Sequence, residues 1–182
     1  MPSSRNVNRN GKGADVSATL EKIDHDNYDD DYIRGILRRT NVIAMVGASP
    51  NWNRPSYFAM KYLQQKGYRV IPVNPKEAGG EILGERVYAG LAEIPVKVDM
   101  VDCFRASAAI PPIADEAIKI GAKVLWLQLG VRNDEAAAKA EAAGLQVVMN
   151  RCPKIEFGRL SREIGWMGVN TRVINSKRQS RI

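Results

Sequence analysis

The sequence predicts an α/β fold with a mainly parallel sheet of about five strands. Segments with the character of strands and of helices alternate from residue 42 to residue 149, which is the order that produces parallel strands joined by helices. The strand segments are apolar throughout instead of alternating, as in strands buried on both faces. Together these observations predict a single doubly wound, Rossmann-like domain with helices on both faces of the sheet.

Each expected element has a local reason. Acidic residues after Asp29 and Arg38-Arg39 at the far end match the dipole of a first helix, and Asn133 is the expected N-cap of the last helix. Glycines at 67, 121 and 144 close three helices. We expect strands at 42–46, 68–73, 100–104, 124–129 and 145–149, helices at 56–65, 110–120 and 133–143, a polar loop over 79–88 and one helical turn at 91–95.

The net charge of +7 is unevenly distributed. Residues 26–150 contain 15 basic and 15 acidic residues, whereas residues 151–182 contain eight basic and two acidic ones. This distribution argues against a nucleic-acid-binding face. We expect a disordered N-terminal lead over residues 1–25, the folded domain over 26–160 and a basic, solvated C-terminal tail over 161–182.

The few cysteine and histidine residues exclude several classes of site. Cys103 and Cys152 fit neither a disulfide scaffold nor a zinc site, so we expect no metal and a cytoplasmic protein. His25 is the only histidine and is expected to be solvated in the N-terminal lead, so no catalytic residue is predicted. No apolar run is long enough to cross a membrane, and no secretion leader is evident.

The turn after the first strand is the strongest candidate for an anion site. Small residues let the backbone approach a phosphate, and the next helix directs unpaired N–H groups at the same place. Arg54 adds a fixed charge. The same pattern is also found in a purely structural corner, and the full dinucleotide motif is absent. The residues that we expect at this turn are Gly47, Ala48, Ser49, Asn53, Arg54 and Ser56.

In doubly wound sheets the ligand binds beyond the carboxyl ends of the strands. We therefore expect the strand exits to meet at one rim, where Arg54, Lys76 and Arg105 would suit a ligand with several phosphates and Phe104 would offer a flat face to a base. The further residues predicted at this rim are Asn74, Pro75, Gln128, Leu129 and Gly130, with residues 150–153 beside them. Asn74 replaces the acidic residue typical of NAD sites.

At this point the sequence resembles the small CoA-binding domain proteins of bacteria and archaea and the N-terminal domain of the succinyl-CoA synthetase alpha subunit. The segments that carry the resemblance are 46–49, 54–56, 70–75, Gly84 with 87–88, 101–102 with 104–105, 126–130 and 151–153. The resemblance implies that residues 47–51 hold the phosphates of coenzyme A, that Lys76 contributes charge and that residues 128–130 lie beside the nucleotide. The synthetase's active-site histidine belongs to a second domain absent here.

Binding of coenzyme A or an acyl-CoA without catalysis, by a carrier, sensor or regulatory subunit, is the function that the sequence favours. An NAD(P)-dependent oxidoreductase and a scaffold with an empty nucleotide fold are the alternatives. A further hypothesis is that Cys103 or Cys152 exchanges with the CoA thiol. The alternative is that both cysteines have only structural roles. Asp102 is expected to bond loop backbone. Whether a second copy or a protein partner binds is left open.

Overall fold

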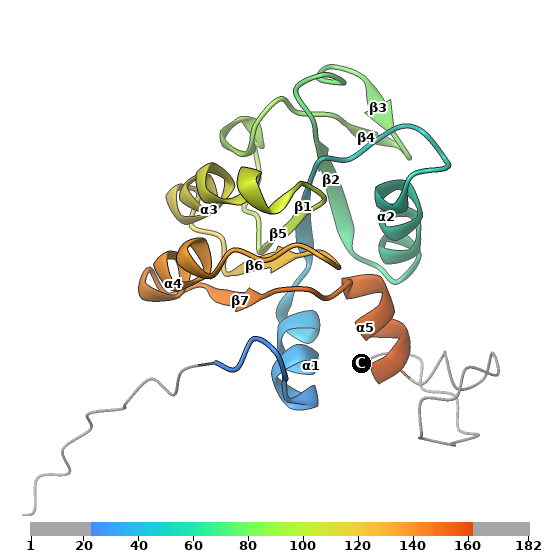
Figure 1. The fold of residues 1–182 in the computed structure, drawn as a ribbon. Helices are drawn as coiled ribbons and strands as arrows, with labels where there is room; N and C mark the ends of the chain where they lie inside the picture. Colours follow the sequence, from blue (N-terminus) through green and yellow to red (C-terminus); the bar gives the residue numbers. More distant parts are fainter. Residues whose placement is uncertain (1–22, 162–182) are drawn as a thin grey trace, which may run out of the picture.

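Five strands form one parallel sheet in the order β2-β1-β5-β6-β7 (Figure 1). The computed structural model describes residues 23–161. The strands are β1 (Val42–Val46), β2 (Arg69–Val73), β5 (Met100–Cys103), β6 (Val124–Leu127) and β7 (Gln146–Val148). Every pairing between neighbouring strands in this sheet is parallel, so the predicted sheet is confirmed.

Helices cover both faces of the sheet, which confirms the doubly wound arrangement (Figure 1). One face carries α1 (Asp30–Arg39), α2 (Pro55–Gln65) and α5 (Pro153–Leu160), and the other carries α3 (Ile110–Lys119) and α4 (Asp134–Ala142). Two short 3-10 turns, η1 (Leu91–Glu93) and η2 (Ser107–Ala109), lie in the connections.

Alternate residues of each strand point to opposite faces of the sheet. Ile43, Met45 and Trp126 pack in the core beneath α1, α2 and α5. Ala44 and Leu125 pack in the core beneath α3 and α4. All five side chains are inaccessible to solvent, which explains why the strands read as continuous apolar runs.

The structure corrects several predicted elements. The strand expected over 124–129 ends at Leu127, because the chain turns there and Val131 N–H donates to Gln128 C=O. The loop over 79–88 contains a small antiparallel hairpin, β3 (Glu81–Ile82) with β4 (Glu85–Arg86). Helix α5 was not predicted from the sequence, and its Phe157 packs into the core. The predicted basic tail lies outside the described residues, apart from Ser161.

The prediction of a solvated His25 is wrong. One ring nitrogen, Nδ1, lies 2.8 Å from Tyr28 Oη, and Nε2 lies 3.2 Å from Glu141 Oε1 on α4. The tyrosine hydroxyl also accepts the Met149 N–H at 2.6 Å. The aromatic rings of Tyr28 and Tyr32 stack beside this cluster, so aromatic packing holds residues 25–32 against the domain.

The chain passes from β1 to β2 on one side and later to β5 on the other, so the order of strands switches at β1. Backbone hydrogen bonds to β2 and to the residue after β5 fix the end of β1. Gly47 N–H donates to Val73 C=O at 2.9 Å, and Phe104 N–H donates to Val46 C=O at 2.8 Å. Gly47 has a φ of 85°, in the left-handed region that glycine adopts most easily. A crevice at this switch point is the usual ligand site of such folds.

Replacing Gly47 by alanine is expected to destabilise the domain by about 2–4 kcal/mol, because the strained φ and an overlap with the Phe104 carbonyl both cost free energy. Gly67→Ala is the matched control: its φ is 93°, but nothing lies within 4 Å of an added Cβ, so we expect a loss of about 1 kcal/mol. Urea unfolding measures both. Equal losses would show that the close approach to Phe104 does not matter.

Candidate functional site

A cavity of about 860 Å³ lies at the carboxyl ends of the strands, at the switch point. The β1–α2 turn, the loop after β5, the loop after β6 and the start of α5 enclose it. Most of the residues that the sequence predicted for the site line this cavity: Gly47, Ser49, Asn53, Arg54, Ser56, Phe104, Arg105, Gln128 and Leu129. The fold thus brings four separate segments of the chain to one place.

The β1–α2 turn is held in shape by its own hydrogen bonds. Asn51 N–H donates to Ser49 Oγ at 3.2 Å, and Asn53 N–H donates to Asn51 Oδ1 at 2.9 Å. Arg54 is the N-cap of α2, Pro55 begins the helix, and no side chain among the described residues caps it. Pro55 has no N–H, and the Tyr57 N–H donates to Arg54 C=O at 3.0 Å. This helix start therefore offers an anion the Ser56 N–H and the positive end of the helix dipole.

Three cationic side chains line the cavity: Arg54, Arg105 and Lys154. Arg105 lies directly over the turn, since its Cδ is 2.9 Å from the position that a Gly47 Cβ would occupy. Lys154 was not predicted from the sequence; its ammonium is 5.8 Å from the centre of the Tyr62 ring. A signal was present, because Pro153 in the first turn is typical of a helix start.

The structure does not bring the exit of β2 to this cavity. Asn74 turns back, donating from Nδ2 to Ala48 C=O at 2.8 Å and accepting the Lys76 N–H at 3.1 Å. Lys76 is exposed and does not line this cavity. Pro75 lines a smaller hollow of about 240 Å³ next to the cavity. The exit of β2 therefore lies beside the β1–α2 turn, but its residues do not line the main cavity.

Two other predicted residues support the site without lining the cavity. Ala48 is 1% exposed and packs in the core. Gly130 has a φ of 74°, and its N–H donates to Asn150 Oδ1 at 2.8 Å. That bond ties the loop after β6 to the segment after β7.

Asp102 is fully buried in β5, and its partner is a side chain instead of the predicted loop backbone. Gln128 Nε2 donates to Asp102 Oδ1 at 2.7 Å, whereas Asp102 Oδ2 finds no partner among the described residues. Burial raises the pKa of Asp102 to about 7, although the Gln128 hydrogen bond opposes the shift. A carboxyl group that titrates near neutral pH thus lies behind a residue that lines the cavity.

Only one of the two cysteines reaches the cavity. Cys103 is fully buried on the opposite face of the sheet, in the core beneath α3 and α4, which agrees with the structural alternative and places it away from the rim. Cys152 is the N-cap of α5 and lines the cavity. Burial raises the pKa of both thiols, so they remain protonated and weakly nucleophilic at neutral pH.

Apolar side chains surround the mouth of the cavity. Phe58 is 48% exposed and lines the cavity with Leu129 and Ile155. Its neighbours Ala59 and Leu63 on the same helix are buried.

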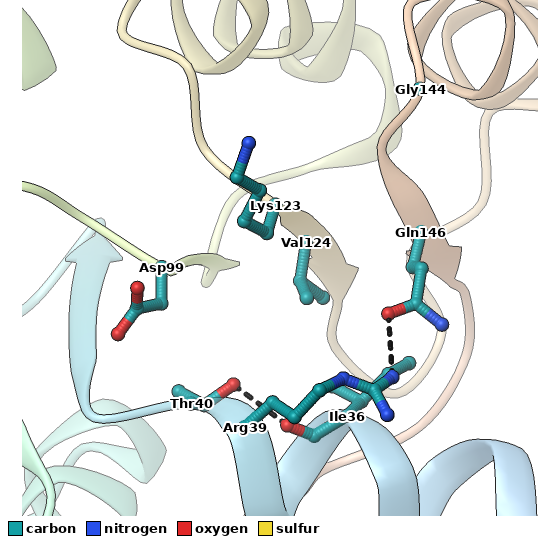
Figure 2. Close-up of a pocket in the computed structure, with 8 residues that line it drawn as sticks. All are labelled: Ile36, Arg39, Thr40, Asp99, Lys123, Val124, Gly144 and Gln146. Carbon is teal, nitrogen blue, oxygen red and sulfur yellow. Dashed lines mark hydrogen bonds between the residues drawn. The ribbon is translucent and has the colours of Figure 1, made fainter.

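A second cavity, of about 290 Å³, lies at the amino ends of β6 and β7 (Figure 2). Its polar groups are already engaged: Arg39 donates to Gln146 Oε1 at 3.1 Å, and Asp99 Oδ2 accepts the N–H groups of Asn41 and Val42. Lys123 points away from Arg39 in Figure 2. These side chains stabilise the amino ends of the strands and do not point toward one common ligand position.

Within residues 23–161, no cluster of three or more His, Cys, Asp and Glu side chains could hold a metal ion. The helices there are too short or too polar to span a bilayer.

Because its folded pKa of about 7 exceeds the value of about 3.9 for a free carboxyl, Asp102 favours the folded state less as the pH rises between these values. We expect Asp102→Asn to gain about 2–3 kcal/mol of stability relative to the wild type between pH 5 and pH 8, at about 1.4 kcal/mol per unit. Denaturant unfolding at both pH values measures this gain, with the exposed Asp115→Asn as control. If the free energy of unfolding of Asp102→Asn changed with pH in parallel with that of the wild type, the prediction would be contradicted.

Comparison with known proteins gives the same picture. The family model described as a CoA binding domain matches residues 41–158. The Bacillus subtilis protein YneT is 38% identical over 123 residues, which are 68% of this chain and 90% of YneT. A structure from Pyrococcus horikoshii is 44% identical with a TM-score of 0.70, covering 77% of this chain and 97% of that one.

Larger proteins contain a related region. The alpha subunit of the ADP-forming acetate–CoA ligase I of Pyrococcus furiosus is 34% identical over 87 residues, which are 46% of this chain but 19% of that subunit. The matched region therefore makes up about a fifth of the ligase subunit. Since the family model covers well over half of its length, this chain belongs to the CoA binding domain family.

Proposed function

We propose that this protein binds coenzyme A or an acyl-CoA, without catalysing a reaction, in the cavity at the carboxyl edge of the sheet. The observation that carries the proposal is the meeting of the Gly47 turn, the uncapped start of α2 and the Arg54 and Arg105 guanidinium groups in that cavity. Backbone N–H groups and guanidinium groups together suit a ligand with several phosphates.

The fold suggests how the ligand is oriented. In doubly wound folds the pyrophosphate lies at the first strand-to-helix turn, and the ribose of the nucleotide lies beyond the second strand. The small hollow lined by Pro75 is on the side of β2 and shares Gly47 and Arg105 with the main cavity. We therefore place the adenosine end toward this hollow, within reach of the exposed Lys76.

Several features support a binding role without catalysis. Asp102 is separated from the cavity by Gln128, and the only histidine is engaged with Tyr28 and Glu141. A carrier, a sensor or a regulatory subunit that reports bound coenzyme A fits this arrangement.

Calorimetric titration of ligand-stripped protein with coenzyme A tests the proposal, with NAD, NADP and ATP as comparison ligands. We expect selective binding of coenzyme A that Arg54→Ala weakens about tenfold or more, because a charge-assisted hydrogen bond contributes about 1.5–3 kcal/mol. Lys123→Ala is the matched control, because that cation lies at the opposite edge of the sheet. Equal weakening by both variants, or tighter binding of NAD(P), would contradict the proposal.

A further inference from the structure

Exposed apolar side chains gather at the mouth of the main cavity. Five large apolar side chains among the described residues are substantially exposed: Trp52, Phe58, Val96, Leu129 and Ile155. Three of them, Phe58, Leu129 and Ile155, line the cavity and come from α2, the loop after β6 and α5. Exposed apolar groups that meet at a cavity mark a binding surface more often than scattered ones do.

The phosphate-binding features and this apolar mouth occupy different parts of the cavity. Arg105 packs over Gly47 at the end of β1. Leu129 follows β6 and Ile155 follows β7, and both strands lie on the side of β1 away from β2. Leu129 and Ile155, two of the three residues of the mouth, are therefore on the side away from the hollow that we assign to adenosine, and Phe58 lines the same cavity from α2.

Coenzyme A has two ends, the nucleotide and the pantetheine arm that carries the thiol. If the adenosine lies toward β2 and the pyrophosphate at Gly47, the arm runs toward β6 and β7. Its end then reaches the apolar mouth, where Cys152 also lines the cavity. A free thiol would leave much of the Phe58, Leu129 and Ile155 side chains in contact with water.

Resting on the proposed function, we infer that the mouth formed by Phe58, Leu129 and Ile155 receives the acyl chain of an acyl-CoA thioester. The ligand class is then an acyl-CoA with an apolar chain of several carbons, in preference to free coenzyme A. Burial of the chain removes apolar surface of both partners from water, which is the main source of affinity for such groups. Lys154 does not oppose this, because its ammonium packs on the Tyr62 ring.

Titration with coenzyme A and with hexanoyl-CoA tests the inference. We expect hexanoyl-CoA to bind at least tenfold more tightly, which corresponds to about 1.4 kcal/mol, because several methylene groups leave water when the chain is buried. Phe58→Gln should bring the ratio of the two dissociation constants toward one. Trp52→Gln should leave the ratio unchanged, because Trp52 is 69% exposed but does not line the cavity.

The other outcomes are distinguishable. Equal affinities for coenzyme A and hexanoyl-CoA would overturn the inference and leave the proposed function intact, whereas binding of neither would overturn both. Tighter binding of succinyl-CoA than of hexanoyl-CoA would overturn it by showing that a cation selects the acyl group. The inference would also be overturned if the apolar mouth formed a dimer contact instead. Sedimentation would then show a dimer that depends on Phe58 and that hexanoyl-CoA does not affect.

Discussion

The close approach of two backbone segments at Gly47 is the constraint on which the rest of the site depends. Gly47 N–H bonds to Val73 C=O in β2, and the Cα of Gly47 lies so near the Phe104 carbonyl that a Cβ would overlap it. This contact joins the first turn to the end of β5. It allows Arg105 to lie over the turn that begins α2. Without it, the cations and the helix start would not share one cavity.

The sheet provides the rigidity that this arrangement needs. Its strands are buried on both faces, and their ends fix where each loop leaves the core. Side chains then fasten the loops to one another, as Asn150 does for Gly130 and Gln128 does for Asp102. The hydrogen-bonded pair of Asp102 and Gln128 lies in the core immediately behind the cavity. A charge is costly to bury there. A site built on loops is in this way held by a scaffold that moves little.

Much of the site could be predicted from the order of elements, because parallel strands direct their carboxyl ends to one edge. Gly47, Arg54, Arg105 and Gln128 were found by that rule and line the cavity. Lys76 was predicted by the same rule and does not line it, since β2 is an edge strand and Asn74 turns back toward Ala48. Lys154 was missed, because nothing local says which face of the sheet α5 packs on.

By itself the sequence determined the fold class, the sequence of strands and helices and the turn after β1, because these depend on apolar periodicity, caps and glycine, which are local properties. Only the tertiary structure decided which exits meet and which side chains remain in water. Phe58 is exposed and Cys103 is buried on the far face because of the elements that pack beside them. Such contacts join residues far apart in the chain, so local patterns do not specify them.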